Sequence, residues 1–502
     1  MEMSYWQTSA RLQQFGAISQ DIEVDVVVIG AGLTGITAAY LFKKAGAKVA
    51  LLERARCAAA DTGHTTAHLT YVTDTRLSEL VKTLGRDAAK AFWEAGAAAI
   101  DEIYTIAAQM APDCEFKWTP GYLHAALDGD EHKDRESLEA DAQYAREMGF
   151  DARFMPSVPG VDRCGVRFEN QAKFHPLKYL APLVAAIPGD GSYVFENTEA
   201  HDIDDEPMTV HAGQYKIRCQ YLMIATHTPL LGKTGLAKGT LFQSKLALYT
   251  SYVIGARLPK GQVPEALYWD TTDPYYYLRV DSLGKDAYAI FGGEDVKTGQ
   301  DTEPKSKFAR LENRFKKMFP QAEIQNRWLG QVVETNDGLP FIGESAGKQF
   351  IATGFCGNGF TLGTLSAVMA VDRYLGRKNP WFELFNVERK KFHGGTWSYI
   401  KENLDYPYYL LRDQFAKVAG DSLDDLKLGE GKILKLNGKK VAAYRDPDGK
   451  VILRSPICTH LGCIVRWNPA DQTWDCPCHG SRFQPGGKVF AGPAESDLSK
   501  IE

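Results

Sequence analysis

Two short segments near the C-terminus have the residue types and spacing of a metal centre. They are Cys458-Thr459-His460-Leu461-Gly462-Cys463 and Cys476-Pro477-Cys478-His479-Gly480-Ser481. Together they supply thiolates and two imidazoles, a ligand set that suits a 2Fe–2S cluster in which two histidines replace two cysteines on one iron. Structural zinc is the alternative, because zinc is commonly bound by two Cys and two His, but zinc leaves the extra cysteine of each segment unexplained. The pattern therefore favours one-electron transfer, with an electron partner expected in the same chain.

The two segments resemble the Rieske family, in the subtype found in cytochrome bc complexes. This resemblance implies four cluster ligands, which are Cys458, His460, Cys476 and His479. It also implies a disulfide that clamps the two loops together, between Cys463 and Cys478.

One residue departs from the pattern of the high-potential members of that family. Those members carry a serine and a tyrosine after the second segment, and both donate hydrogen bonds to sulfur. Ser481 is retained here, but Phe483 stands in place of the tyrosine. Since hydrogen bonds to sulfur stabilise the more negative reduced cluster, we expect a potential below the top of the Rieske range.

Length and composition set broad limits on the rest of the chain. The 502 residues are enough for two or three domains, and the formal net charge of −5 gives no indication of nucleic-acid binding. No basic segment leads into an apolar run at the N-terminus, and no stretch reaches the roughly 18 apolar residues of a spanning helix. We therefore expect a cytoplasmic protein without a membrane span. Five scattered cysteines are expected to be free thiols, namely Cys57, Cys114, Cys164, Cys219 and Cys356.

The N-terminal part carries a dinucleotide-binding pattern. An apolar run at 24–29 predicts a buried parallel strand, and it leads directly into Gly30-Ala31-Gly32-Leu33-Thr34-Gly35. Helical periodicity follows over 36–45, and a second strand at 48–52 ends at Glu53. A G-x-G-x-x-G motif between strand and helix, with an acid about twenty residues on, predicts nucleotide binding. The helix N-terminus should bind phosphate, and the Glu53 carboxylate should bind ribose hydroxyls.

Later segments favour FAD over NAD as this nucleotide. Residues 221–226, 328–330, 337–343 and 354–361 resemble, in order and spacing, elements of the D-amino-acid-oxidase-like FAD family. The resemblance covers about 20–390 and implies a Rossmann-like α/β FAD domain with an antiparallel substrate sheet. The FAD-binding residues that it implies are Gly30, Gly32, Leu33, Thr34, Gly35, Glu53, Arg54, Thr62, Gly63, His64, Thr65, Thr66, Ala225, Thr226, Asp337, Gly338, Gly357, Asn358, Gly359, Phe360 and Thr361.

The loop at 61–68 runs beside the flavin in relatives. His64 is therefore a possible point of covalent flavin attachment, as in some amine oxidases. The alternative, which we favour, is that the Thr and Gly residues of this loop simply contact phosphate or flavin through hydrogen bonds.

The segments at 120–190 and 240–325 are expected to form the substrate sheet over the flavin. Two-residue alternation in a strand places Tyr275, Tyr277 and Arg279 on one face. These residues could bind a substrate carboxylate, with Tyr277 and Arg279 as the candidate catalytic residues. A solvent-facing sheet surface explains the same pattern equally well. His175 and His227 are candidates for the active-site rim, although a structural role is favoured for each.

The predicted domain plan has four parts: an N-terminal arm at 1–23, a FAD-dependent oxidoreductase at 24–390, a helical linker at 391–420 and an all-β Rieske domain at 421–502. Within the second part, the FAD-binding pieces are expected at about 24–120, 190–240 and 326–380. The linker should contain a helix over 398–418, kinked at Pro407. An Asn437-Gly438 turn predicts a hairpin in the last domain.

This plan predicts a FAD-dependent amine or amino-acid dehydrogenase. Substrate gives two electrons to FAD as hydride, and they then pass singly to the cluster and on to an external acceptor. Two alternatives remain open: an external donor could reduce the cluster so that flavin reduces a substrate or partner, or the chain could be a non-enzymatic redox sensor. A Rieske oxygenase is disfavoured, since no iron site with two histidines and a carboxylate is evident in the sequence.

Overall fold

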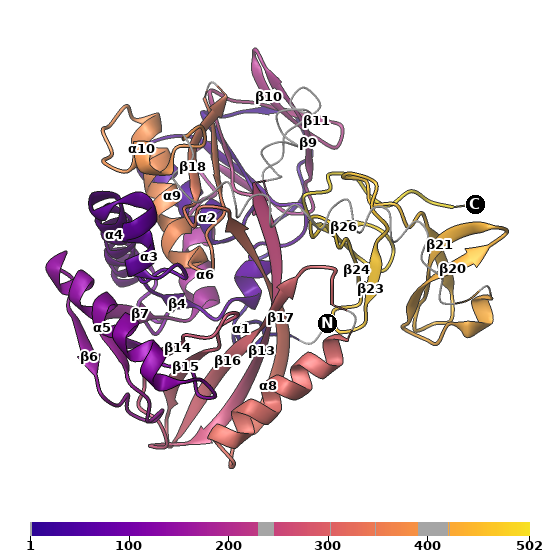
Figure 1. The fold of residues 1–502 in the computed structure, drawn as a ribbon. Helices are drawn as coiled ribbons and strands as arrows, with labels where there is room; N and C mark the ends of the chain where they lie inside the picture. Colours follow the sequence, from indigo (N-terminus) through magenta and orange to yellow (C-terminus); the bar gives the residue numbers. More distant parts are fainter. Residues whose placement is uncertain are drawn as a thin grey trace.

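In the computed structural model, a large body of helices and sheets carries a small all-β domain on one side (Figure 1). The structure describes residues 3–228, 245–301, 303–346, 348–389, 420 and 422–501. The helix expected over 398–418 lies outside these residues.

The dinucleotide-type sheet has six strands among the described residues, and five of them run parallel. Its strands, in spatial order, are β18 (Phe341–Ala346), β19 (Gln349–Thr353), β12 (Tyr221–Ile224), β2 (Val26–Ile29), β3 (Val49–Leu52) and β8 (Tyr193–Phe195). The strand at the edge, β18, is antiparallel to β19. The sequence predicted both β2 and β3 as strands and β2 as buried, and the structure shows both completely buried.

Helices α2 (Leu33–Lys44) and α9 (Gly359–Tyr374) pack on this sheet. Helices α6 (Pro176–Ala185) and α4 (Arg86–Met110) pack on α2 and α9, respectively, and all four share one hydrophobic core with the sheet. Both α2 and α9 begin immediately after a glycine-rich turn, as the motifs predicted. Among the described residues, no helix combines the length and apolarity needed to cross a bilayer.

The second sheet is mainly antiparallel and lies below the first in the view of Figure 1. Its strands, in order, are β17 (Glu323–Thr335), β13 (Leu246–Pro259), β16 (Asp286–Lys297), β15 (Tyr277–Leu283), β14 (Leu267–Asp270), β5 (Lys117–His124), β7 (Gly165–Lys173) and β4 (His68–Leu69), with β6 (Ala152–Met155) beside β7. Strand β17 falls within the piece at 326–380 that was expected to bind FAD, and it pairs along its length with β13 of this second sheet.

Smaller elements complete the body. A four-stranded sheet joins β1 (Ile22–Glu23), β11 (Tyr215–Arg218), β10 (Met208–Ala212) and β9 (Ala200–Asp205). The remaining helices are α1 (Tyr5–Ser9), α3 (Leu77–Leu84), α5 (Glu131–Glu147), α8 (Pro304–Met318) and α10 (Phe382–Phe385).

The C-terminal domain contains two small antiparallel sheets, as expected. One comprises β20 (Gly431–Leu436), β21 (Lys439–Arg445) and β22 (Val451–Arg454), and the other comprises β23 (Arg466–Asn468), β24 (Thr473–Asp475), β25 (Arg482–Phe483) and β26 (Val489–Ala491). The predicted hairpin turn is confirmed: Asn437 and Gly438 both have positive φ and join β20 to β21. The two cysteine–histidine segments form the loops after β22 and after β24.

Three glycines bring this domain into close contact with the body. A Cβ atom on Gly299 would lie 2.5 Å from the carbonyl carbon of Cys476, and one on Gly480 would lie 2.6 Å from Cβ of Leu248. A Cβ atom on Gly492 would lie 2.2 Å from Oγ1 of Thr228. At each of these three contacts the two parts of the chain approach more closely than a residue with a Cβ atom would allow.

Candidate functional site

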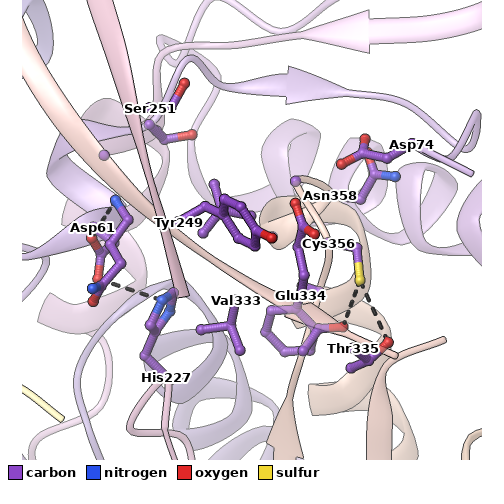
Figure 2. A pocket seen from close by; sticks show the side chains of 18 of the residues that line it. Asp61, Asp74, His227, Tyr249, Ser251, Val333, Glu334, Thr335, Cys356 and Asn358 are labelled. Atoms are coloured by element: carbon purple, nitrogen blue, oxygen red, sulfur yellow. Dashed lines mark hydrogen bonds and ion pairs between the residues drawn. The ribbon is translucent and has the colours of Figure 1, made fainter. Parts of the chain in front are cut away.

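A cavity of about 1340 Å³ opens where the parallel strands end. The carboxyl ends of β2, β3 and β12 reach it at Gly30, Glu53 and Ala225. Strands β13 and β17 form another wall of the cavity. Figure 2 shows Tyr249 in the middle of the view, between Asp61 and His227 on one side and Cys356 on the other. Ligands of open α/β sheets bind in this position, at the carboxyl edge of the strands.

The first glycine turn has the geometry of a phosphate cradle. Gly30 has φ 98°, and a Cβ there would lie 2.5 Å from the Ala225 carbonyl oxygen. A Cβ on Gly35 would lie 1.8 Å from the Gly30 carbonyl oxygen, so glycine is needed for the helix to pack on the turn. The N-terminus of α2 consequently lies at the cavity wall, where Gly32, Leu33 and Thr34 are exposed to it.

Glu53 is held at the end of β3 by backbone donors. Its carboxylate accepts hydrogen bonds from the amides of Ala31, at 2.9 Å, and Ala55, at 2.8 Å. Burial raises the pKa of this carboxyl above its ordinary value. The carboxylate is thus fixed beside the cavity, in the position expected for a ribose contact.

The loop at 61–66 forms a short 3₁₀ helix (Asp61–His64) along the cavity. Thr62 Oγ1 accepts a hydrogen bond from the Leu33 amide at 3.0 Å. The N-terminal segment holds the loop from behind, since Trp6 Nε1 donates to the Thr65 carbonyl oxygen at 2.7 Å and Ser4 Oγ donates to that of Gly63. His64 also lines the cavity, and its Nδ1 lies 2.9 Å from the Ala60 carbonyl oxygen.

Most of the residues predicted to bind cofactor line this one cavity. They are Gly30, Gly32, Leu33, Thr34, Glu53, Arg54, Thr62, His64, Thr65, Thr66, Ala225, Thr226, Asp337, Gly338, Gly357, Asn358, Gly359 and Phe360. Three others support the wall without lining it: Gly35 packs on Gly30, Gly63 packs on the Ala58 carbonyl oxygen, and Thr361 donates to the Thr70 carbonyl oxygen at 3.0 Å.

The two candidate rim histidines have different positions. His227 lines the cavity, with Nε2 3.9 Å from Oδ2 of Asp61. His175 caps the N-terminus of α6 instead, and its ring packs at 5.0 Å from that of Trp6. Only His227 is therefore at the cavity.

The expected role of Arg279 is wrong. Its side chain does not line the cavity, is only 2% exposed, and donates from Nε to both oxygens of Asp281, at 3.2 and 2.9 Å. Nη1 donates to the Ala67 carbonyl oxygen at 2.8 Å, and the guanidinium lies 4.9 Å from the ring centroid of Trp6. These contacts leave Arg279 no route to a substrate carboxylate.

Tyr277, in contrast, lines the cavity together with Tyr275. The Tyr277 hydroxyl lies 2.7 Å from Oγ of Ser251, and Tyr275 donates to Oδ1 of Asp74 at 2.9 Å. Asp74, Ser251 and a further wall residue, Asp295, were missed by the sequence analysis. They follow no local motif: Ser251 and Asp295 lie on the paired strands β13 and β16, and Asp74 lies in the loop between β4 and α3.

The two cluster-type loops place the four expected ligands together. The thiols of Cys458 and Cys476 are in hydrogen-bond contact, and the rings of His460 and His479 lie 4.9 Å apart. Sulfur atoms of Cys463, Cys476 and Cys478 also lie within 4.8 Å of one another, but a disulfide of 2.00 Å joins Cys463 to Cys478. Of those three, only Cys476 remains to bind metal, so two thiols and two imidazoles form the donor set.

The second cluster loop rests on the wall of the cavity. Gln300 Nε2 donates to the Pro477 carbonyl oxygen, and Gln331 Nε2 donates to that of Gly480, both at 3.0 Å. The backbone amide of Gln331 donates to Oδ1 of Asp61, a residue that lines the cavity, at 3.1 Å. The C-terminal domain also contributes residues 490–495 to the cavity lining, and Arg54 Nη2 donates to the Phe490 carbonyl oxygen at 2.6 Å.

Family models match nearly the whole chain. A model described as FAD dependent oxidoreductase matches residues 25–373, and a model described as Rieske [2Fe-2S] domain matches residues 417–502.

Two relatives extend over most of the chain. A putative Rieske 2Fe-2S iron-sulfur protein, YhfW, of Bacillus subtilis is 32% identical over 99% of this chain and 97% of its own length. Gamma-glutamylputrescine oxidoreductase of Escherichia coli is 23% identical over 82% of this chain and 98% of its own length.

Solved structures show the same fold for the body. Glycine oxidase from Geobacillus kaustophilus superposes with a TM-score of 0.62 at 16% identity, over 73% of this chain and 99% of that one. L-Proline dehydrogenase from P. horikoshii gives a TM-score of 0.58 at 16% identity, over 73% of this chain and 97% of that one. FAD and a 2Fe–2S cluster are the cofactors of the two domains, and the glycine cradle and the two-thiol, two-imidazole donor set fit them.

Proposed function

Because the chain belongs to the FAD-dependent oxidoreductase family and ends in a Rieske [2Fe-2S] domain, we propose that it oxidises an amine or amino acid at a C–N bond and passes the electrons through the cluster to an external acceptor. Relatives and fold neighbours named for gamma-glutamylputrescine, glycine and proline support a C–N substrate. When bound, FAD supplies a hydride acceptor and the cluster supplies a one-electron acceptor.

The main support for the proposal is that only a thin wall separates the cavity from the second cluster loop, at 476–481. Leu248 and Tyr249 are consecutive in β13, yet Leu248 packs on Gly480 while Tyr249 lines the cavity. Gln331 lies on β17, the strand that pairs with β13. Its side chain donates to Gly480 in the cluster loop, and its backbone amide donates to Asp61 in the cavity. A single strand layer thus separates the backbone beside His479 from the cavity that fits FAD.

The chain's own residues hold this arrangement in place. Gly299 and Gln300 dock the backbone of Cys476 and Pro477, and Thr298 fixes the Gln331 amide at 3.1 Å. The N-terminal segment fixes the loop at 61–66 from the far side. Both cofactor-bearing loops are therefore positioned by buried contacts rather than by exposed side chains.

A glycine substitution at this contact tests the proposal. Gly299→Ala adds a Cβ 2.5 Å from the Cys476 backbone at φ 80°, so the cluster loop must shift. Gly284→Ala is the matched control, because Gly284 also has positive φ (60°) but nothing within 4 Å. With an amine and amino-acid panel under anaerobic conditions, we expect flavin bleaching in both variants and slower cluster reduction only in Gly299→Ala. Equal cluster reduction in the two variants contradicts the proposed route.

A further inference from the structure

One end of the cavity combines two carboxylates with two phenols. Tyr275 donates to Asp74, while Tyr277 contacts Ser251, which in turn is hydrogen-bonded to Asp295. The two phenol rings lie 5.9 Å apart, and all of these residues line the cavity. Figure 2 shows Asp74 and Ser251 at the far side of Tyr249 from His227.

The packing around this end is tight. A Cβ on Gly357 would lie 2.8 Å from Oδ2 of Asp74, so the carboxylate rests on the glycine turn that opens α9. A Cβ on Gly292 would lie 2.2 Å from the ring of Tyr277. The ring of Tyr277 is thus packed against backbone, and Asp74 lies beside the glycine turn with its side chain open to the cavity.

The Asp295 carboxylate can still accept a hydrogen bond from a ligand. Its Oδ1 is buried and accepts no hydrogen bond from the residues that the structure describes. The nearby cation Lys307 donates to the Glu294 carbonyl oxygen at 2.8 Å and pairs with the Glu294 carboxylate at 3.8 Å. A buried carboxylate oxygen without a donor favours a bound cation or hydrogen-bond donor.

Three arginine and lysine side chains line the cavity in the described part of the chain. They are Arg54, Arg76 and Lys82. Arg54 follows Glu53 and donates to Phe490, while Arg76 donates to Asp141 at 2.7 Å and to Ser137 at 2.8 Å. Lys82 lies in the last turn of α3. With Arg279 bound to Asp281, no described guanidinium faces Asp74 and Asp295 to receive a substrate carboxylate.

From this arrangement we propose that the Asp74–Tyr275 and Asp295–Ser251–Tyr277 groups bind the ammonium of an alkyl amine that carries no carboxylate. The inference rests on the proposed function and assigns its substrate class. Two carboxylates attract an ammonium and repel a carboxylate, and phenol faces add a cation–π contribution.

The pKa shifts of the two carboxyls are consistent with that assignment. Loss of hydration inside the cavity raises the pKa of the Asp74 carboxyl to about 7 and that of Asp295 to about 6. A nearby cation favours the ionised form of such groups, so a bound ammonium stabilises both carboxylates.

Binding can be measured apart from oxidation with two probes that lack an α-hydrogen. tert-Butylamine and α-aminoisobutyrate share a carbon skeleton, but one methyl of the first is a carboxylate in the second, and neither can donate hydride. On the full-length holoenzyme, calorimetry or the flavin difference spectrum should show tert-butylamine binding about tenfold or more tightly than α-aminoisobutyrate. Equal or tighter binding of α-aminoisobutyrate, or no binding of tert-butylamine, overturns the inference.

Variants locate the binding groups. Asp74→Asn and Asp295→Asn should each weaken tert-butylamine binding about tenfold or more while FAD content stays at the wild-type level. Asp162→Asn is the control, because Asp162 is an exposed acid with φ 58°, which asparagine tolerates. Unchanged affinity in both Asp74→Asn and Asp295→Asn refutes the assignment. Failure of every oxidisable amine to bleach the flavin would instead refute the proposed function, so the two failures are distinguishable.

Discussion

The Nε2 atom of Gln331 donates a hydrogen bond of 3.0 Å to the carbonyl oxygen of Gly480, the residue that follows His479. The same nitrogen lies 3.1 Å from Oγ1 of Thr298, and both contacts are buried. One side chain of the oxidoreductase body is thus bonded directly to the loop that carries an expected cluster ligand.

Removing this bond should weaken docking of the cluster loop. Gln331→Leu keeps the volume but leaves the Gly480 carbonyl oxygen without this donor, and a hydrogen bond of this kind contributes about 0.5–1.5 kcal/mol. The rate of cluster reduction after flavin reduction should therefore fall about two- to tenfold, measured by rapid mixing. Gln321→Leu, at an exposed position, is the control and should leave the rate unchanged. A wild-type rate in Gln331→Leu would show that this bond does not position the loop.

Restoring a hydroxyl beside the cluster should raise its reduction potential. Phe483 is fully buried in one core with Cys458 and Cys476, so Phe483→Tyr adds a donor in the shell around sulfur. A hydrogen bond to a charged group contributes about 1.5–3 kcal/mol, which for one electron corresponds to about 60–130 mV.

Removing the Ser481 hydroxyl should shift the reduction potential in the opposite direction. Its hydroxyl is already in hydrogen-bond contact with the Cys458 sulfur, so Ser481→Ala should lower the potential. Protein-film voltammetry measures both shifts, and an unchanged potential in Phe483→Tyr would refute the argument from hydrogen bonding.

Amine binding should depend on pH through Asp74. Loss of hydration inside the cavity raises the pKa of this carboxyl to about 7, so its ionised fraction increases as the pH rises through that value, whereas the amine stays protonated across the range. Affinity for tert-butylamine should increase as pH rises from about 6 to 8. The groups that act on Asp74 are Tyr275, whose hydrogen bond lowers this pKa, and Asp295, whose charge raises it.

Two variants separate these contributions. Tyr275→Phe should move the midpoint of the affinity profile to higher pH, because the stabilising hydrogen bond is lost. Asp74→Asn should remove the inflection near pH 7 altogether. An inflection that persists in Asp74→Asn would assign it to another group.

The Rieske domain should depend on a buried ionic network. Arg482 pairs with Asp471 and Asp475 and donates from Nη2 to Thr473 at 3.1 Å, and all four residues are buried. Arg482→Leu leaves two buried carboxylates without their cation, at a cost of about 3–5 kcal/mol. Cluster loss in denaturant, followed by visible absorbance, should occur at a lower concentration than in the wild type. Lys450→Gln, at an exposed position, should behave as the wild type.

Contiguous motifs were predictable from the sequence because their chemistry is local. The glycines around Gly30 and the two cysteine–histidine loops each act through neighbours in the chain, and the structure brings most of those residues to one cavity or one cluster site. Asp74, Asp295 and Gln331 were not predictable, since only the tertiary structure brings them to the cavity. Asp295 and Gln331 reach it on strands that pair with β13, and Asp74 reaches it on the loop before α3.

Arg279 shows where the pattern misled. Alternation correctly placed it on the face of Tyr277, but Asp281 lies two residues further on that same face and neutralises the guanidinium. That signal was present in the sequence as an acid at i+2. An arginine in a strand therefore needs its i±2 neighbours checked before a substrate role is assigned.

The most direct measurement follows both cofactors after anaerobic mixing with an amine that reduces the flavin. Flavin absorbance should fall first and the spectrum of the reduced cluster should appear second, at a rate that does not change when protein concentration is varied. A cluster that stays oxidised, or one whose reduction accelerates in proportion to protein concentration, would contradict electron transfer within one chain.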